Sequence, residues 1–378
     1  MMRSTDRILT SHAGSLPRPP DLLEQNRAIQ RGEDVDTSRR PQMIRDGVRD
    51  VVRLQVEAGI DSVNDGEFSK TVFLDYANRM SGFQAAAYTA SPVYRRRNMI
   101  EFQDFFNELY PNRGGIGMQP NCVGPITYVG QEMIKTDIEN LKAALQGQDV
   151  VEGFLPAIAP GTFGRGSNQY YKTEEEFLFA IGEAMHEEYK AVIDAGFVLQ
   201  LDDPGLPDTW DAIIPEPSIE EYRKFAQMRI EALNHGLRGL PEDRIRYHIC
   251  WGSWHGPHTN DIPLEDIVDL MLMVNAGCYS LEAANARHEH EWRVWQDVKL
   301  PDGKSLMPGV VGHATNVVEH PRLVADRLIR YASLVGRENV IAGTDCGLGG
   351  RVHPSIAWAK LKALREGADL ASKELWGK

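Results

Sequence analysis

The second half of the sequence alternates short apolar segments with longer amphipathic ones. The apolar segments are about six residues long and rich in strand-forming residues; they are Phe197–Asp203, Ile245–Cys250, Cys278–Ala283, Met307–Gly312 and Val340–Asp345. Between and around them, apolar residues recur with the period of a helix; these segments are Glu174–Ala195, Ser218–Leu237, Leu264–Asn275, Asn285–Gln296, Pro321–Leu334 and Ser355–Leu370. Such alternation is typical of βαβ units and predicts a parallel sheet.

The first half is less regular but supplies the remaining strands. Ile8–Ala13, Gly59–Asp65 and Pro120–Ile126 are candidates, and a helix is predicted over Pro41–Ala58. Eight parallel strands with helices between them predict an α/β fold of the (β/α)8 TIM-barrel class. An open doubly wound sheet is the alternative, but no Gly-rich dinucleotide turn favours it. We expect one domain, 1–378, with an excursion near 68–117.

Composition narrows the function classes. The chain has 378 residues, a net charge of −13 and four cysteines. An acidic chain without a long basic run is a poor candidate for binding nucleic acid or anionic lipid. So few cysteines exclude a disulfide framework and fit a reducing compartment. Neither an apolar leader nor a membrane-spanning segment is evident, so we expect a soluble, cytoplasmic protein without nucleic-acid or membrane partners.

Polar residues capable of chemistry follow most of the predicted strands. In a barrel, functional side chains gather at the carboxyl ends of the strands. Here those ends carry Ser15, Asp65, Glu67, Asp202, Asp203, His248, Cys250, Glu282, His313, Asp345 and Cys346. Metal-binding and acidic side chains from several strands are therefore expected on one face of the barrel.

Four of these residues suit a zinc ion. His248 and Cys250 are two residues apart on one strand, so their side chains point the same way. Glu282 and Cys346 come from other strand ends, and zinc accepts thiolate, imidazole and carboxylate in tetrahedral geometry. Taken singly, each has a simpler explanation, because a lone cysteine is usually a core residue. The combination predicts a Zn²⁺ site, and Cys122 and Cys278 are interpreted as core residues.

A second histidine cluster is a rival metal site. His255 and His258 lie in one short segment, and His288 and His290 lie in another. Four histidines could bind a second ion. The alternative is that they line the rim of the barrel or face solvent, as isolated surface histidines commonly do.

Seven motifs in order along the chain carry a family resemblance. They are SHAGSLPRP (Ser11–Pro19), NDGEF (Asn64–Phe68), VGPIT (Val123–Thr127), LQLDDP (Leu199–Pro204), HIC (His248–Cys250), LEAA (Leu281–Ala284) and TDCGL (Thr344–Leu348). Together they resemble the catalytic C-terminal barrel of cobalamin-independent methionine synthase over nearly the whole chain. The resemblance implies a barrel of the methionine synthase/uroporphyrinogen decarboxylase-like type.

The resemblance also implies roles for individual residues. His248, Cys250, Glu282 and Cys346 match the family's zinc ligands, and the zinc lowers the pKa of a substrate thiol. The other matches concern the substrate: Ser15 for its carboxylate, Glu67 and Asp202 for the amino group of homocysteine, and His313 for protonating the leaving group. Independently of the resemblance, Asp345 is a nearby acid that could supply this proton instead. Two simpler readings remain open, because Asp202 could cap a helix and Ser15 could be a turn residue.

The chain departs from the family where the alkyl donor would bind. It lacks the family's second barrel, and no Trp closely follows the GPIT segment, unless Trp251 or Trp254 substitutes. The inserts 160–171 and 251–263 have no counterpart that we recognise. Folate, a corrinoid protein or an epoxide therefore all stay open as the donor.

We expect an enzyme: a zinc-dependent methyltransferase, related to 5-methyltetrahydropteroyltriglutamate–homocysteine methyltransferase in methionine biosynthesis. A thiol would displace one ligand, Glu282, and attack an alkyl carbon as thiolate. The alternatives are an epoxyalkane:coenzyme M transferase and, from another class, a non-catalytic metal-binding barrel. Arg18, Arg165 and Arg351 could bind an anionic tail, or could be surface or structural residues.

Overall fold

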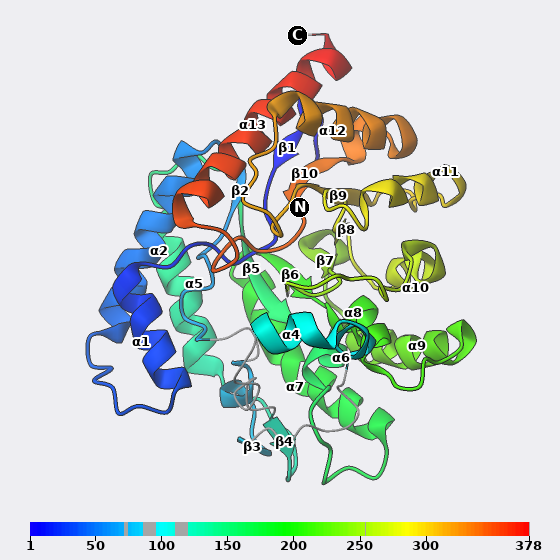
Figure 1. Cartoon of the computed structure of the whole chain (residues 1–378). Coiled ribbons are helices and arrows are strands. Elements are labelled where there is room, and N and C mark those ends of the chain that lie inside the picture. Colours follow the sequence, from blue (N-terminus) through cyan, green and yellow to red (C-terminus); the bar gives the residue numbers. More distant parts are fainter. Residues whose placement is uncertain (72–74, 86–95, 110–119, 254, 378) are drawn as a thin grey trace.

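Eight parallel strands form one sheet that curls into a barrel (Figure 1). The computed structural model describes residues 1–377 except 72–74, 86–95, 110–119 and 254. The strands, in their order around the sheet, are β1 (Leu9–Thr10), β10 (Ile341–Thr344), β9 (Ser305–Val311), β8 (Cys278–Leu281), β7 (Ile245–Ile249), β6 (Val198–Asp202), β5 (Glu152–Ile158) and β2 (Ser62–Val63). The predicted TIM-barrel class is confirmed.

The barrel closes between its two shortest strands. β1 and β2 share no strand ladder, but the backbone N–H of Asp61 donates to the carbonyl of Thr10 at 3.1 Å. The Ser11 hydroxyl donates to the carbonyl of Ser62 at 3.2 Å. These contacts bring the two edges together, so the residues that follow β1 and β2 face the same mouth as those that follow the other strands.

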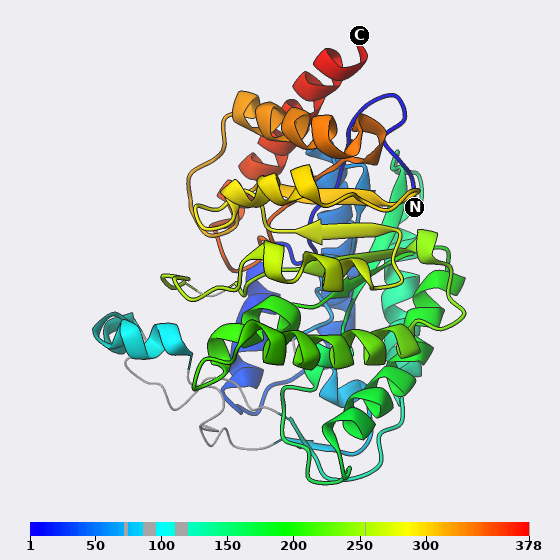
Figure 2. The same cartoon turned by 90° about the vertical axis from the view of Figure 1, so that its right-hand side faces the viewer.

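Helices surround the strands, as Figures 1 and 2 show from two directions. The α-helices are α1 (Pro20–Gln30), α2 (Arg40–Glu57), α3 (Arg97–Glu101), α4 (Gln103–Leu109), α5 (Gln131–Leu145), α6 (Pro160–Phe163), α7 (Glu174–Asp194), α8 (Gly205–Ala212), α9 (Ile219–Gly236), α10 (Val268–Leu272), α11 (Val294–Asp297), α12 (Pro321–Val335) and α13 (Pro354–Trp376). Short 3₁₀ helices are η1 (Ala77–Arg79), η4 (Glu242–Arg244), η5 (Leu264–Asp266), η6 (Glu289–Arg293) and η7 (Arg337–Asn339).

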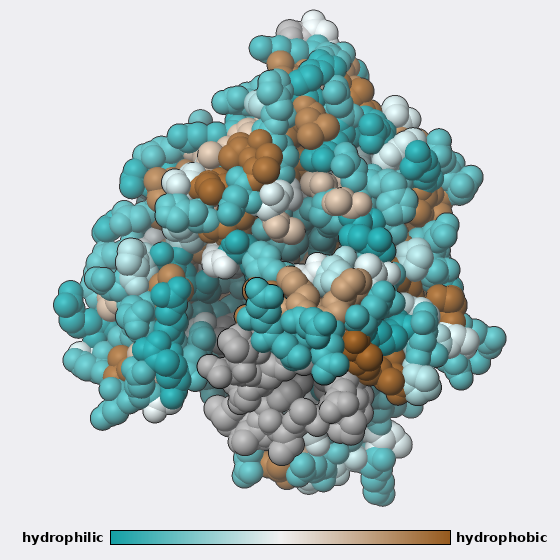
Figure 3. Space-filling view, in the orientation of Figure 1, coloured by the Kyte–Doolittle hydropathy of each residue, from teal (hydrophilic) through white to brown (hydrophobic). Residues whose placement is uncertain are grey.

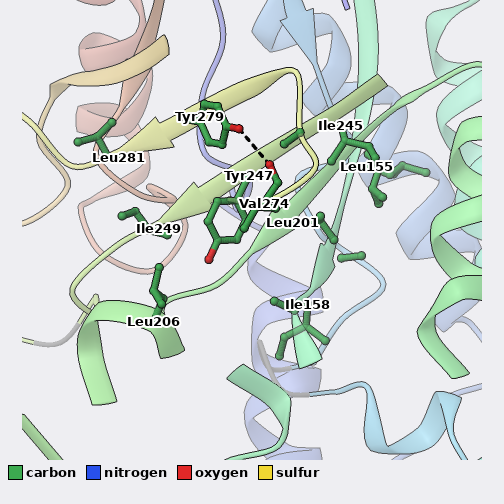
Figure 4. Packing of buried hydrophobic residues seen from close by; sticks show 14 of the residues in the cluster. Leu155, Ile158, Leu201, Leu206, Ile245, Tyr247, Ile249, Val274, Tyr279 and Leu281 are labelled. Atoms are coloured by element: carbon green, nitrogen blue, oxygen red, sulfur yellow. Dashed lines mark hydrogen bonds between the residues drawn. The ribbon is translucent and has the colours of Figure 1, made fainter. Parts of the chain in front are cut away.

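The alternation of side chains along β7 separates core from site. Ile245, Tyr247 and Ile249 are buried in the main hydrophobic cluster (Figure 4). Arg246 and His248 alternate with them and therefore point to the opposite side, into the barrel. Because of this period of two, the apolar side chains of β7 point toward the surrounding helices and the His248 side chain points into the barrel.

The strand predicted over Pro120–Ile126 is not part of the barrel. Pro120–Cys122 forms β4, which pairs antiparallel with β3 (Phe83–Ala85) in a separate two-stranded sheet. The third barrel strand is β5, which sequence reasoning missed. Pro156 lies inside β5, beyond the part that pairs with β2, so its missing N–H breaks no ladder there.

The segment between β2 and β5 contains the predicted excursion near 68–117. Its described parts include η1, β3, α3 and α4, while 72–74, 86–95 and 110–117 lie outside the described residues. The Arg97 side chain donates to the carbonyl of Trp210 at 3.0 Å, and Asn98 accepts from the N–H of Thr259 at 3.1 Å. These bonds dock α3 on segments that follow β6 and β7.

The surface in the view of Figure 3 is mostly hydrophilic, with scattered apolar residues. Within the described part of the chain, we find no helix with the length and apolar character needed to cross a bilayer.

Candidate active site

A cavity of about 390 Å³ opens at the carboxyl ends of the barrel strands. Its lining combines thiols, acids and guanidinium groups: the described residues are Ala13, Ser15, Arg18, Glu67, Thr71, Arg96, Arg165, Asp202, Pro204, Asp208, His248, Cys250, Gly252, Ser253, Cys346, Gly347, Gly349 and Arg351. Strand-end residues were expected to lie together on one face of the barrel. Those that line the cavity are Ser15, Glu67, Asp202, His248 and the two cysteines.

Three of the four predicted zinc ligands lie together. One ring nitrogen of His248 and the Sγ atoms of Cys250 and Cys346 lie within 4.8 Å of one another. The two sulfur atoms are 3.7 Å apart, far beyond the length of a disulfide bond. Two sulfurs bound tetrahedrally to zinc, each about 2.3 Å from it, would be separated by about 3.8 Å. The spacing of this group, which we call the thiol–imidazole group, therefore fits zinc.

The His248 ring presents a nitrogen to this group. Its Nδ1 pairs with the Ser280 hydroxyl at 3.0 Å, and its Nε2 is buried without a hydrogen-bond partner. A polar contact on one ring nitrogen is the usual way to orient a histidine that ligates through the other. The orphaned Nε2 is therefore the atom available to a metal.

The two thiols differ in acidity. The hydrogen bond with the Cys250 thiol lowers the pKa of Cys346 well below its ordinary value, and His248 adds to the effect. The same contact, together with burial, raises the pKa of Cys250. The Ser253 hydroxyl also donates to the Cys346 sulfur at 2.8 Å. Cys346 is thus the first of the pair to become a thiolate.

Glu282, the fourth predicted ligand, belongs to a neighbouring group. Ligand atoms of Glu282, His313 and Asp345 lie within 4.8 Å of one another, and Glu282 is also close enough to Cys250 and Cys346 for their charges to interact. Burial, together with the charges of Asp345 and Cys346, raises the pKa of Glu282 well above its ordinary value. We call these three residues the acid–imidazole group.

The two candidate proton donors lie in this group, away from the described lining of the cavity. Asp345 accepts from the N–H groups of Ala283 and Ala284 at 2.7 and 2.8 Å through Oδ1, and its Oδ2 has no partner. Burial raises the pKa of Asp345 to about 7. The Nδ1 of His313 is buried without a partner, and burial lowers the pKa of this ring.

The predicted amino-group ligands, Glu67 and Asp202, both line the cavity. Asp202 ends β6 and accepts from the Gln200 amide at 2.7 Å, so it does not cap a helix. Burial raises its pKa to about 7, and the nearby charge of Glu67 adds to this effect. Glu67 has a φ of 62°, a left-handed conformation that is unusual for a residue with a side chain. Such strain is common at binding sites.

Ser15 lies where the segment after β1 crosses the segment after β10. Its carbonyl accepts from the N–H groups of Leu348 and Gly349 at 2.9 and 3.0 Å. A Cβ on Gly347 would be 2.2 Å from the Ser15 hydroxyl oxygen, so only glycine permits this approach. Ser15 follows the bend at Gly14 and lies outside any helix, strand or turn, and it also lines the cavity beside Cys346.

The arginines of the cavity differ in their partners. Arg18 donates to the carbonyls of Glu67 and Lys70, which makes it structural. Arg165 forms an ion pair with Asp208 at 2.9 Å. Arg351 lies exposed on the turn after β10. Sequence reasoning missed Asp208 and its second partner, Arg96, because that contact joins α8 to the excursion.

The rival histidine cluster does not assemble as four histidines. Within the described residues, His255 and His290 are exposed, and neither of the two ligand groups includes them. His258 and His288 instead share the carboxylate of Asp261, at 3.0 and 3.1 Å. His255 and His290 therefore face solvent, one of the two expected alternatives, whereas His288 is buried.

Trp251 is not available to stack on a donor in the cavity. Its ring is buried, with 1 % exposed, and it stacks on His288 with the ring centres 3.8 Å apart. Trp254, the other candidate for a stacking residue, lies outside the described residues. The first part of the insert 251–263 is therefore anchored in the core beside the thiol–imidazole group.

The fold and cavity define a (β/α)8 barrel with clustered thiols and an imidazole at its mouth. No family model matches the chain. A methionine synthase of Sulfolobus acidocaldarius is 24% identical over 375 residues, which cover 97% of this chain and 93% of that protein. A methionine synthase of Saccharolobus solfataricus is 24% identical over 374 residues, covering 97% and 95%.

Solved structures show the same fold. A B12-independent methionine synthase from Shewanella sp. W3-18-1, in complex with selenomethionine, has a TM-score of 0.75 and 22% identity, covering 98% of this chain and all of that one. A putative vitamin-B12-independent methionine synthase from Listeria monocytogenes has a TM-score of 0.68 and 18% identity, with the same coverage. The resemblance to the cobalamin-independent methionine synthase family is confirmed.

Proposed function

We propose that this protein is a zinc-dependent methyltransferase that methylates the thiol of homocysteine. The observation that carries the proposal is the thiol–imidazole group of His248, Cys250 and Cys346, which opens into a cavity lined by Glu67 and Asp202. The names of curated relatives along 97% of the chain support the same reaction. The free state of all four cysteines fits a cytoplasmic enzyme.

The donor set suits zinc better than a hard cation. Two thiols and an imidazole are the ligands that zinc takes in proteins, whereas magnesium and calcium take oxygen. When bound by these residues, zinc would lower the pKa of a substrate thiol and make it nucleophilic at neutral pH. Glu282 would be the fourth ligand, and its displacement by the substrate thiol would leave three protein ligands, as is typical of a catalytic zinc site.

The acids of the cavity would orient an amino-acid thiol. Glu67 and Asp202 present two carboxyl groups to the space beside the cysteines, and an ammonium group is their natural partner. Ser15 lies beside Cys346 and would hold the substrate carboxylate through its hydroxyl. Gln200 and Lys70 already contact these acids, at 2.7 Å from Asp202 and 3.9 Å from Glu67. A sulfonate thiol without an amine would add no ammonium contact to either acid, so this lining favours homocysteine over coenzyme M.

The acid–imidazole group would supply a proton during methyl transfer. His313 and Asp345 are buried beside Glu282, each with an unpartnered polar atom. We propose that His313, or Asp345 in its place, supplies the proton that the leaving group needs. In this proposal the methyl donor is a folate or a corrinoid protein. If the alkyl donor were an epoxide, the reaction would instead be that of an epoxyalkane:coenzyme M transferase.

Metal content and thiol binding test the proposal together. Purified protein should contain one zinc per chain, and X-ray absorption should show one additional sulfur neighbour with homocysteine but not with coenzyme M. Methionine should then form from homocysteine with methyltetrahydrofolate or a methylated corrinoid. A response to coenzyme M alone would favour the epoxide transferase. Absence of zinc, or of any thiol response, would favour a non-catalytic barrel.

A further inference from the structure

The carboxylate of Glu282 is held by two hydrogen-bond donors. The backbone N–H of Trp251 donates to Oε1 at 2.9 Å, and the side-chain amide of Asn285 donates to Oε2 at 2.5 Å. Glu282 is buried, with 4 % exposed. Each carboxylate oxygen of Glu282 therefore accepts a hydrogen bond from the protein, at a buried position where few water molecules can reach it.

The orientation of the Asn285 amide follows from its other contacts. Its Oδ1 accepts from the backbone N–H groups of Arg287 and His288 at 2.9 and 3.0 Å. A flipped amide would direct its NH₂ group at these two donors, so only one orientation satisfies them. Nδ2 must then point to Glu282. The turn that begins at Asn285 thus holds this donor in place.

The second donor is equally fixed. Trp251 donates from its indole nitrogen to the carbonyl of Ile262 at 2.7 Å and stacks on His288. His288 is held in turn, because its two ring nitrogens face Glu291 at 2.8 Å and Asp261 at 3.1 Å. The backbone N–H of Trp251 has little freedom to follow Glu282 if that side chain moves.

We infer that Asn285 is a positioning residue that holds Glu282 beside the thiol–imidazole group and makes it the ligand that a substrate thiol displaces. This inference rests on the proposed function. Each oxygen of Glu282 keeps a lone pair that could reach a metal, but the two donors share its negative charge and fix its direction. Asn285 and Trp251 therefore satisfy the charge of Glu282 when a thiol takes its place on the metal.

The test replaces the donor and keeps the turn. In Asn285→Asp, an oxygen can still accept from Arg287 and His288, but no amide N–H reaches Glu282. In Asn285→Ala, the donor is lost without a new carboxyl group. Asn234→Asp is the matched control, because Asn234 accepts from the N–H of Asn275 at 2.9 Å and donates to the carbonyl of Met273 at 2.9 Å, remote from the cavity.

The readout is homocysteine binding to cobalt-substituted protein, measured as the increase in the thiolate-to-cobalt absorption band above the level that the two cysteine ligands give. We expect both Asn285 variants to keep one metal per chain and to bind homocysteine about tenfold more weakly, because Glu282 then competes better for the metal. The control should match the unaltered protein. Equal homocysteine affinity in the Asn285 variants, or loss of their metal, would overturn the inference.

The same measurement separates this inference from the proposed function. If the unaltered protein binds cobalt and homocysteine but the variants bind equally well, only the role of Asn285 is wrong. If the unaltered protein binds no metal, or its thiolate-to-cobalt band does not increase with homocysteine, the proposed function fails and the role of Asn285 fails with it. Asn285→Ala should also lower the thermal stability, because it removes the acceptor of the turn. Asn285→Asp should lower it at neutral pH, because it places a second carboxyl group against Glu282.

Discussion

The sulfur atoms of Cys250 and Cys346 lie 3.7 Å apart, although 96 residues separate them in the chain. Cys250 follows β7 and Cys346 follows β10, so two other strands stand between them in the sheet. Closure of the barrel brings both strand ends to the mouth, where their side chains converge. This pair forms the base of the candidate site.

Replacement of either cysteine should remove the metal without unfolding the barrel. We expect Cys250→Ala and Cys346→Ser to lose zinc and methyl transfer, because one thiol and one imidazole are a poor site for zinc. Metal analysis and circular dichroism check this. Cys122→Ser is the control, since Cys122 contacts the carbonyl of Gly124 and not the cavity. Stoichiometric zinc in both variants would refute the ligand assignment.

Asp202 should matter for thiols that carry an amine. With Asp202→Asn, we expect the KM for homocysteine to rise roughly tenfold or more, because a charge-assisted hydrogen bond to the ammonium is lost. The KM for a thiol of similar length without the amine should change little. Steady-state kinetics with both thiols measure this. An equal rise in KM for both thiols would show that Asp202 does not bind the amino group.

The site makes the stability of metal-free protein depend on pH. Burial raises the pKa of Asp345 to about 7, so the folded state binds this proton more tightly than the unfolded state does. The free energy of unfolding therefore falls as pH rises from about 4 to about 7, by up to about 4 kcal/mol for this carboxyl group. Thermal unfolding of chelator-treated protein should show a lower Tm at neutral pH, and Asp345→Asn should reduce the slope. An unchanged slope in the variant would contradict this.

A buried ion-pair network should anchor the excursion. The Arg79 guanidinium contacts Asp137 at 2.6 Å and Glu188 at 3.1 Å, and all three residues are buried. Arg79→Ala would leave two buried carboxylates without a counter-charge, at a cost of about 3–5 kcal/mol. Chemical denaturation measures this. Adding Asp137→Asn and Glu188→Gln to Arg79→Ala should recover part of the loss, which distinguishes charge from packing.

Gly14 should be irreplaceable for the position of Glu67. Its φ is +122°, and a Cβ at this residue would lie 2.4 Å from a carboxylate oxygen of Glu67. Gly14→Ala should cost about 1–3 kcal/mol of stability through backbone strain and raise the KM for homocysteine by displacing Glu67. Zinc content should stay at one per chain. Gly32→Ala, where φ is also positive but the space is open, controls for strain alone.

Sequence reasoning located most of the barrel because its strands carry a local signal. Apolar segments of about six residues lie in β6, β7, β8, β9 and β10. β5 was missed because Pro156 interrupts its apolar run, and a proline inside a run argues against a central strand. Pro156 is tolerated inside β5 because β2 pairs with β5 only at Glu152 and Gly153 and does not reach Pro156. The sequence of β5 itself does not reveal how far β2 extends.

The strand-end residues were predictable for a similar reason. Ligand type and alternation along one strand pointed to His248 and Cys250, and the order of motifs pointed to Cys346. Glu282 shares the same signal, and its ligand atoms lie within 4.8 Å of those of His313 and Asp345. The contact that holds it comes from Asn285, whose amide orientation depends on a turn that no periodic pattern reveals.

The sequence alone determined the fold class, the face on which the chemistry gathers and the identity of the thiol and imidazole groups. The fold class and the pairing of His248 with Cys250 follow from spacing within single strands and helices, which is local, whereas Cys346 was found from the order of motifs along the chain. Only the tertiary structure decided which strand completes the barrel, which arginines are already paired and where Glu282 rests. Those outcomes depend on contacts between segments far apart in the chain, whose distances and free energies are set when the barrel closes.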